Sequence, residues 1–293
     1  MEHQLWPRVE ESIERLRGER FRPRAKYSDA TIVRVYYWAA MHDRPVCWAC
    51  DRRNWPLHAG RQPLPSPPTM SRRLRSPSVI ALLDAIEQAV VRPAQAPLVH
   101  CLDGKPLPIG GCSKDRQAGY GRAAGGMAKG YKMHALVAHK GTVTAWRIAP
   151  MNVDERVMAR RILRQTSIAG YVLGDANYDD NKTHAICETK GNLQLLTPRR
   201  YGNQKGLGHH KQNPGRLRSI ERLYGPMPLF ARNLWKGRSD IERYFGNLTS
   251  WSAGLTHLPP WVRTYRRVRR WVQAKLVLNR LRIQLRQRTY VAA

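Results

Sequence analysis

Residues 170–180 read Gly-Tyr-Val-Leu-Gly-Asp-Ala-Asn-Tyr-Asp-Asp, a short apolar run that leads directly into an aspartate and a turn. The apolar residues 171–173 predict a buried strand, and Gly174 with the polar residues after it predicts a tight turn. In open α/β sheets, ligands lie beyond the carboxyl ends of the strands, so Asp175 has a position suited to chemistry. The alternative interpretation is that Asp175 only caps the next helix.

Further expected strands and helices surround this segment. One helix is expected after Asn152 and another over 180–188, whereas residues 110–130 contain too much glycine to predict a packed element. The pattern around 139–141 predicts an antiparallel hairpin. This order of elements predicts an α/β fold with a mixed five-stranded sheet flanked by helices. The expected strands span residues 98–102, 132–139, 142–148, 171–173 and 193–196.

Asp103 follows the first expected strand, as Asp175 follows the fourth. If these two strands are neighbours in the sheet, the two carboxylates face each other at its edge. Two carboxylates at short range are electrostatically unfavourable unless a divalent cation lies between them. The sequence therefore predicts a metal site, with Asp179 and Asp180 as substitutes if one of the first two aspartates lies elsewhere.

A third acidic residue, Glu242, lies in segment 235–248, which predicts a helix whose apolar stripe packs on the sheet. Arg238 lies four residues before Glu242, on another face of that helix. No acidic residue follows Glu242 in the chain, so this carboxylate is isolated in a basic region. It either joins the two aspartates or forms a solvent-exposed ion pair with Arg238.

The chain is strongly basic, with a net charge of +30 from 51 basic and 21 acidic residues. Nucleic acid is the natural partner, because neutralising phosphates releases counterions and dominates such binding. Residues 261–288 predict one long helix or two, with apolar residues inward and arginines outward. These arginines either follow DNA phosphates or form a solvated surface. They are Arg266, Arg269, Arg270 and Arg280.

The first 92 residues are expected to be helical and separate from the sheet. A helix is predicted over 30–41, and the proline-rich residues 60–68 interrupt the helical pattern. A short basic helical turn over 69–75 then precedes a longer helix that begins at Pro77. This order resembles a helix-turn-helix DNA reader, and an ordinary helical bundle with a solvated basic face is the alternative. The candidate DNA-contacting residues are Arg72, Arg73 and Arg75.

Cys47 and Cys50 form a Cys-x-x-Cys pair with His42 and His58 nearby. A single pair without a second one is a weak signal for structural zinc. The N-terminus has no secretory leader, and no apolar run is long enough to cross a membrane. The sequence therefore predicts a cytoplasmic protein.

Four short motifs occur in a fixed order on the expected elements. They are Asp103 after the first strand, Lys129-Gly-Tyr-Lys-Met-His134 at the hairpin, Gly174-Asp175 with Tyr178-Asp179, and Arg238-x-x-x-Glu242-x-x-Phe245. Over roughly residues 95–285 the chain thus resembles a bacterial insertion-sequence DDE transposase. The resemblance implies a ribonuclease H-like fold, with Asp103, Asp175 and Glu242 as the catalytic, metal-binding acids.

The resemblance also implies a chemistry and a set of partners. Two Mg²⁺ ions, which Mn²⁺ can replace, would support cleavage and transfer of DNA strands. The partners would be double-stranded DNA at the element's ends and target, bound by a homodimer located at the nucleoid. The side chains expected to hold the strand near the metals are Lys129, Lys132, His134 and Arg238. The expected domains are a DNA-binding region over 1–92, a catalytic domain over 93–250 and basic C-terminal helices over 251–293 that pack on it.

The chain departs from the family pattern at Trp235, where relatives often carry tyrosine, and at Thr249, where they often carry lysine. These departures weaken the expected DNA contacts at both positions. Residues 199–225 are basic and include the run 209–211, His-His-Lys, and we expect them to become ordered on DNA. Two alternatives remain: a ribonuclease H-like nuclease that does not join ends, and a non-catalytic DNA- or RNA-binding protein of this fold.

Overall fold

The computed structural model describes residues 2–18, 25–56, 63–92, 95, 97–110, 113–138, 141–199, 212–225 and 229–291. The chain divides into two compact units, which are described separately. The first, which we call the helical unit, comprises Met1–Val91, Leu248–Val262 and Arg270–Ala293. The second, which we call the sheet unit, comprises Arg92–Asn247 and Arg263–Arg269.

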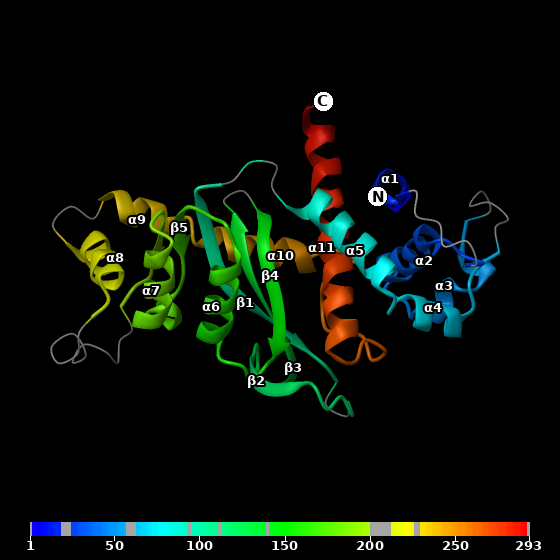
Figure 1. Ribbon diagram of the computed structural model, residues 1–293, viewed down its shortest axis with the longest axis horizontal. Helices are drawn as coiled ribbons and strands as arrows, with labels where there is room; N and C mark the ends of the chain where they lie inside the picture. The colour runs from blue at the N-terminus through cyan, green and yellow to red at the C-terminus, as the bar shows by residue number, and fades with distance from the viewer. Residues whose placement is uncertain are drawn as a thin grey trace. The chain divides into compact units, whose positions relative to one another are not determined.

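A mixed six-stranded sheet forms the centre of the sheet unit (Figure 1). Its strands are β1 (Val99–Pro108), β2 (Gly119–Ala123), β3 (Gly126–Ala138), β4 (Thr142–Pro150), β5 (Gly170–Leu173) and β6 (Leu193–Leu196). Strand β1 runs antiparallel to β3 and parallel to β5, which in turn pairs in parallel with β6. Both β2 and β4 pair antiparallel with β3. The mixed sheet predicted from the sequence is confirmed, with one strand more than expected.

Helices cover both faces of this sheet. Leu102 and Val172 belong to a buried cluster with apolar residues of α6 (Glu155–Gln165) and α7 (Asn181–Thr189). Cys101 faces the other way, because neighbouring residues of a strand alternate between faces, and its Sγ donates to the carbonyl oxygen of Gly237 at 3.4 Å. Gly237 lies between α9 (Leu229–Lys236) and α10 (Ser239–Thr249). The sheet therefore has α6 and α7 on one side and the start of α10 on the other.

The additional strand β2 lies in the glycine-rich stretch 110–130, where we expected no packed element. A Cβ atom at Gly121 would collide with the main chain of Met151, and one at Gly130 with the carbonyl oxygen of Leu107. The glycines therefore permit close approach of neighbouring backbones, and the expectation of an unpacked loop was wrong. The hairpin turn expected at 139–141 falls partly on 139 and 140, which lie outside the described residues.

The helical unit contains α1 (Glu2–Leu16), α2 (Asp29–Met41), α3 (Val46–Ala49), α4 (Pro67–Arg73), α5 (Pro77–Val91) and most of α11 (Tyr265–Val291). Ser28 caps α2 by accepting a hydrogen bond from the Thr31 backbone N–H at 3.1 Å. The predicted positions of α2 and α5 are confirmed, whereas α4 begins and ends two residues before the predicted 69–75, because Pro67 and Pro68 occupy its first turn, where proline is tolerated. In α11, Val268, Val272 and Leu276 are fully buried, as their spacing predicts.

An aromatic cluster occupies the region of the Cys-x-x-Cys pair. The His42 ring lies 4.1 Å from the ring of Trp38 and 5.1 Å from that of Trp48, measured between centroids. Cys50 donates through Sγ to the Val46 carbonyl oxygen at 3.2 Å. Among the described residues, no group of three or more His, Cys, Asp or Glu side chains is placed to hold a metal ion. His58 lies outside these residues.

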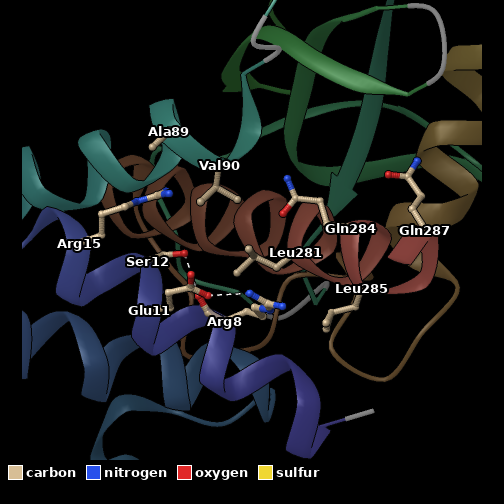
Figure 2. Close-up of a pocket in the computed structure, with 10 residues that line it drawn as sticks. All are labelled: Arg8, Glu11, Ser12, Arg15, Ala89, Val90, Leu281, Gln284, Leu285 and Gln287. Atoms are coloured by element: carbon tan, nitrogen blue, oxygen red, sulfur yellow. Dashed lines mark hydrogen bonds and ion pairs between the residues drawn. The ribbon is translucent and has the colours of Figure 1, made fainter. Parts of the chain in front are cut away.

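A groove of about 580 Å³ lies in the helical unit between α1, α5 and α11 (Figure 2). It is lined by the apolar side chains of Val90 and Leu281 and by polar side chains that include Arg8, Arg15 and Gln284. None of the three acids of the predicted site lines it. In the part of the chain that is described, no helix has both the length and the apolar character needed to cross a bilayer.

Lys275 on α11 is fully buried, and its Nζ donates to Asp43 Oδ1 at 2.5 Å and to the carbonyl oxygens of Ala40 and Ala253 at 2.8 and 2.9 Å. We expect Lys275→Met to lower the free energy of unfolding by about 2–4 kcal/mol at pH 7, because three acceptors lose their donor. Urea unfolding of the variant and of Lys26→Met, an exposed control, measures this loss.

The same pair of proteins tests a pH dependence. Burial lowers the pKa of Lys275 to about 8, while the charge and hydrogen bond of Asp43 act in the opposite direction. In the unfolded chain, a lysine titrates near pH 10.4. Between these values the unfolded state binds more protons, so this lysine makes the wild type more stable as pH rises. The difference between wild type and Lys275→Met should therefore grow from pH 7 to pH 9.5.

Candidate active site

Strand register places Asp103 and Asp175 at the same edge of the sheet. The parallel pairing of β1 with β5 ends at Cys101 and Leu173, and each aspartate lies two residues beyond its member of this pair. The prediction that these two strands are neighbours in the sheet is confirmed. Asp103 does not end its strand, however, because β1 continues to Pro108 along β3, where Asp103 pairs with Ala135. The edge that exposes Asp103 is created by the earlier end of β5.

Asp103 is largely buried, and its carboxylate accepts hydrogen bonds from two donors. Its Oδ1 accepts from the Gly104 backbone N–H at 2.7 Å, and its Oδ2 accepts from Arg238 Nη2 at 2.9 Å. Burial raises the pKa of Asp103 to about 6; the Gly104 hydrogen bond and Arg238 oppose this, while the charges of Asp175 and Glu155 add to it. Asp103 therefore shares its surroundings with two other carboxylates, which disfavours its ionised form.

Arg238 connects the first and third acids. Besides its contact with Asp103, its Nη1 donates to Glu242 Oε1 at 2.5 Å. The Arg238 side chain is 13% exposed, whereas that of Glu242 is 65% exposed. The exposed ion pair considered as an alternative for Glu242 thus exists, but the same guanidinium also holds Asp103. One guanidinium therefore contacts two of the three acids in this structure, and its single positive charge balances only one of them.

Asp175 begins the turn that its sequence predicted. Its Oδ1 accepts from the Asn177 backbone N–H at 3.0 Å and so caps the short 3₁₀ helix η2 (Ala176–Tyr178). The helix that follows, α7, has its own cap, Asp180, which accepts from the backbone N–H groups of Lys182 and Thr183. Asp175 therefore does cap the next helix of the chain, as the alternative interpretation expected, but that helix is the 3₁₀ turn η2 and not α7. The indole N–H of Trp235 donates to the Gly174 carbonyl oxygen at 3.4 Å, beside Asp175.

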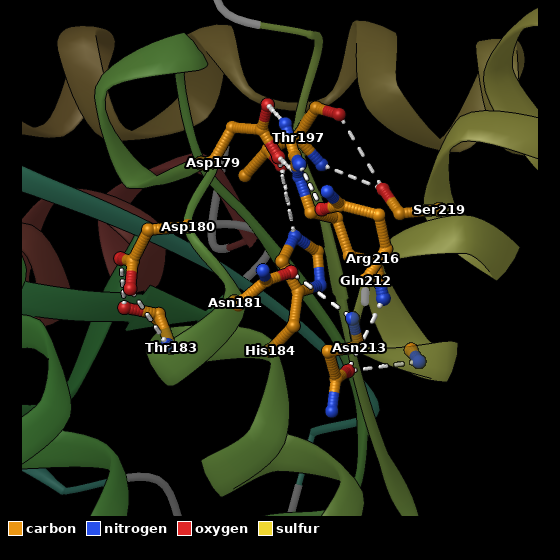
Figure 3. Close-up of polar contacts among 12 residues, drawn as sticks. Asp179, Asp180, Asn181, Thr183, His184, Thr197, Gln212, Asn213, Arg216 and Ser219 are labelled. Carbon is orange, nitrogen blue, oxygen red and sulfur yellow. Dashed lines mark hydrogen bonds and ion pairs between the residues drawn. The ribbon is translucent and has the colours of Figure 1, made fainter. Parts of the chain in front are cut away.

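The two substitute aspartates have other roles. Asp179 is buried and accepts two hydrogen bonds from Arg216, at 2.7 and 2.8 Å (Figure 3). Asp180, besides capping α7, pairs with Arg160 at 3.3 Å. Both carboxylates are thus held by neighbouring basic groups away from the arrangement around Arg238. This leaves Asp103, Asp175 and Glu242 as the candidate acids.

Part of the stretch expected to become ordered on DNA forms a docked helix without it. Helix α8 (Pro214–Tyr224) is held by the Arg216–Asp179 pair and by the Asn213 backbone N–H, which donates to Asn181 Oδ1 at 3.0 Å (Figure 3). For residues 212–225 the expectation was therefore wrong, because these partners lie more than thirty residues away and no local pattern indicates them. Residues 200–211, with the run 209–211, lie outside the described residues.

The side chains expected to hold a DNA strand near the acids are differently placed. Arg238 lies between the acids, and Lys129 donates through Nζ to the Ser113 carbonyl oxygen at 3.0 Å. Lys132 is buried and forms an ion pair with Glu155. His134 is only 1% exposed. Direct DNA contact stays a prediction for these residues, and burial argues against it for Lys132 and His134.

The arginines farther from the acids also separate into two groups. Arg72, Arg75 and Arg266 are exposed, as is Arg267, which the sequence did not single out. Of these, Arg75 also donates through Nε to the Ser71 carbonyl oxygen at 2.9 Å. The other three arginines are less exposed and have protein partners. Arg73 pairs with Asp29, Arg269 lies over the Trp146 ring, and Arg270 donates to the Leu74 carbonyl oxygen and lies over the Tyr36 ring. The exposed arginines are therefore the better candidates for phosphate contacts.

Two residues near the acids, Glu155 and Asn177, were missed by the sequence reasoning. Glu155 occupies the first position of α6, directly after the capping residue Asp154. Its carboxylate accepts from Lys132 on β3 and from Asn177 Nδ2 in the turn after Asp175. The predicted cap located the start of this helix, but no local signal indicated which of its first residues faces the acids.

The comparison with known families agrees with this geometry. The family model described as the transposase DDE domain matches residues 94–279, which include all three candidate acids. Neither the curated proteins nor the solved structures contained a match to the chain. The family match covers well over half of the 293 residues. This chain is therefore a member of the transposase DDE domain family.

Proposed function

We propose that the protein binds the ends of a mobile DNA element and catalyses metal-dependent cleavage and transfer of its strands. The observation that carries this proposal is the position of Asp103, Asp175, Arg238 and Glu242. The first two each lie two residues beyond the end of the parallel pairing of β1 with β5, and Arg238 contacts Asp103 and Glu242 at once. A non-catalytic DNA-binding protein would have no need for this convergence of acids.

The three candidate acids are chemically suited to bind a divalent cation. Carboxylate oxygens are the ligands that Mg²⁺ prefers, and the raised pKa of Asp103, caused by burial and by neighbouring acids, indicates a site that gains from added positive charge. The described side chains do not form a group of three metal ligands in this structure, and Arg238 contacts two of the three candidate acids. Asp103, Asp175 and Glu242 are the residues that would hold two Mg²⁺ ions, or Mn²⁺ in their place.

When bound, the metal ions would activate water or a 3′-hydroxyl and stabilise the leaving oxygen of a phosphodiester. The chain's own residues orient these groups. Asp103 and Asp175 project from the rigid edge of the sheet, and the Asp175 carboxylate is fixed by the Asn177 N–H. Arg238 can pair with a phosphate oxygen of the strand when it leaves a carboxylate, since guanidinium groups bind phosphates in bidentate fashion.

Double-stranded DNA is the proposed partner, bound by two copies of the chain. The net charge of +30 supports a polyanionic partner. The exposed residues Arg72 on α4 and Arg75 in the turn after it are proposed to contact the element's ends, and Arg266 and Arg267 at the start of α11 to contact phosphates of any sequence.

Asp175→Asn tests the proposal. The asparagine still accepts from the Asn177 N–H, so the turn should persist, while an anionic ligand is lost. Labelled duplexes that carry the DNA flanking the gene should be cleaved and joined to a target by the wild type in Mg²⁺. The variant should be at least about 100-fold slower in both steps. Wild-type rates in the variant would exclude the proposed site, and cleavage without joining by the wild type would favour a ribonuclease H-like nuclease instead.

A further inference from the structure

Three side chains crowd around Gly104, the residue that follows Asp103. A Cβ atom at this glycine would lie 2.9 Å from Lys132 Cδ, 3.4 Å from Glu155 Oε1 and 3.4 Å from His134 Nδ1. The lysine and histidine come from β3, and the glutamate comes from the start of α6. A polar cluster therefore lies directly beside the first candidate acid, and no role has been assigned to its glutamate.

Glu155 links this cluster to the second acid. Its Oε2 accepts from Asn177 Nδ2 at 2.9 Å, and the backbone N–H of the same asparagine donates to Asp175 Oδ1 at 3.0 Å. Asn177 thus holds one carboxylate with its side chain and another with its main chain. Glu155 Oε1 accepts from Lys132 Nζ, so the glutamate also connects the turn with β3. The charge of Glu155 reaches Asp103, where it contributes to the raised pKa.

His134 gives an independent sign that the cluster serves more than packing. It is 1% exposed, and within the described residues neither ring nitrogen has a hydrogen-bond partner. Burial lowers the pKa of His134 to about 4, against the charge of Glu155, so the ring is neutral at pH 7. Buried polar groups are nearly always paired, and exceptions are concentrated where a site takes part in binding or catalysis.

We propose that Glu155 is a fourth acidic residue of the active site, a positioning residue that fixes Asn177 and thereby the Asp175 carboxylate. Its second oxygen keeps Lys132 on β3 beside Asp103. This inference rests on the proposed function, because the geometry that Glu155 maintains is that of the metal-binding acids. Residues that orient metal ligands through hydrogen bonds typically change metal affinity or activity by about 10–100-fold when replaced.

Glu155→Gln is the direct test. Glutamine keeps the size of the side chain, but it places an amide N–H₂ against Lys132 Nζ or Asn177 Nδ2, so that donor faces donor. The matched control is Asp154→Asn, which removes one negative charge from the neighbouring position at the same helix terminus. Asp154 caps α6 and pairs with Arg156 at 2.6 Å, and asparagine can still cap the helix.

Metal binding and strand cleavage test the positioning role of Glu155, whereas the thermal unfolding midpoint and the affinity for DNA test whether the variants still fold. Mn²⁺ binding to the full chain, followed by the electron paramagnetic resonance signal of free Mn²⁺, should weaken by about 10-fold in Glu155→Gln and remain unchanged in Asp154→Asn. Single-turnover strand cleavage should fall by about 10–100-fold in the first variant only. The thermal unfolding midpoint and the affinity for DNA should be alike in the two variants.

Asn177→Ala removes the donor of the hydrogen bond to Glu155 Oε2, so the inference stays testable if Glu155→Gln does not fold. It should reproduce both losses, and the double variant should be no worse than the poorer single variant, since the two residues act in one chain of contacts. Additive losses in the double variant would overturn the positioning role. So would wild-type Mn²⁺ binding and cleavage in Glu155→Gln or, if that protein is unfolded, in Asn177→Ala.

Asp175→Asn serves as the reference in the same assays. If it retains full cleavage, the proposed function itself fails. If it is inactive while Glu155→Gln matches Asp154→Asn, only the role of Glu155 is excluded.

Discussion

Glu242→Gln should bind DNA as tightly as the wild type or slightly more tightly, while strand cleavage and transfer in Mg²⁺ fall by at least about 100-fold. The substitution removes an anionic ligand but keeps the shape of the side chain and an oxygen that can accept from Arg238. DNA affinity holds because the protein becomes one charge more positive. Cleavage falls because the metal ions stabilise charge that develops only in the transition state. Filter binding and cleavage of a labelled end measure the two effects.

A matched control for this variant is Glu221→Gln, which removes the same charge from an exposed position on α8 of the same unit. It should leave both binding and cleavage unchanged. Full cleavage by Glu242→Gln would remove this residue from the set of metal ligands. Loss of DNA binding would instead show that the Arg238–Glu242 pair stabilises the fold.

Replacing Arg266 and Arg267 with glutamine should weaken binding to every duplex and flatten its salt dependence. Both side chains are exposed at the start of α11, and each phosphate that the protein no longer neutralises lowers the slope of log K against log salt by about one unit. A double variant that leaves two phosphates without an arginine should thus have a slope smaller by about two units and an affinity about 10-fold or more weaker near 0.2 M salt. Titration of labelled DNA at several salt concentrations measures both.

The comparison for this variant is Arg72→Gln with Arg75→Gln, which removes two exposed charges from the helical unit. If these residues read the element's ends, this variant should lose preference for end-containing DNA, whereas the α11 variant should keep it. Equal loss of preference in both variants would contradict a division between recognition and phosphate binding. Arg270 is unsuitable for such a test, because it holds the Leu74 carbonyl oxygen and its loss would disturb the fold.

Local pattern was sufficient to locate much of the sheet and the second acid. The strands expected at 171–173 and 193–196 are observed as β5 and β6 with at most one residue of difference. A short apolar run bounded by glycine and turn residues is compatible with few structures other than a buried strand, so Asp175 could be placed from its immediate neighbours. The family resemblance then proposed Asp103 and Glu242 as the partners of Asp175, and the register of β1 and β5 agrees with the first of these.

Features that depend on distant partners could not be predicted in this way. Asp103 was expected at a strand end, but β1 continues because β3, about thirty residues farther along the chain, supplies hydrogen bonds as far as Pro108. Lys132 was expected to contact DNA, which stays a prediction, and no local pattern indicated its ion pair with Glu155, which lies 23 residues away. The sequence contains both residues but does not indicate that they meet. Local periodicity carries no information about such pairs.

The contacts of α8 also bear on how this protein can change during evolution. The chain on either side of residues 200–211 is fastened to the sheet unit, by the Thr197 backbone N–H to Ser219 Oγ at 3.1 Å and by the Arg216–Asp179 pair. Thr197 and Arg216 are therefore each held by partners outside the segment between them, and the entropic cost of joining two fixed points of a chain grows only slowly with the number of residues between them. We therefore expect a few residues inserted between these two points to leave Asp175 and α10 in place.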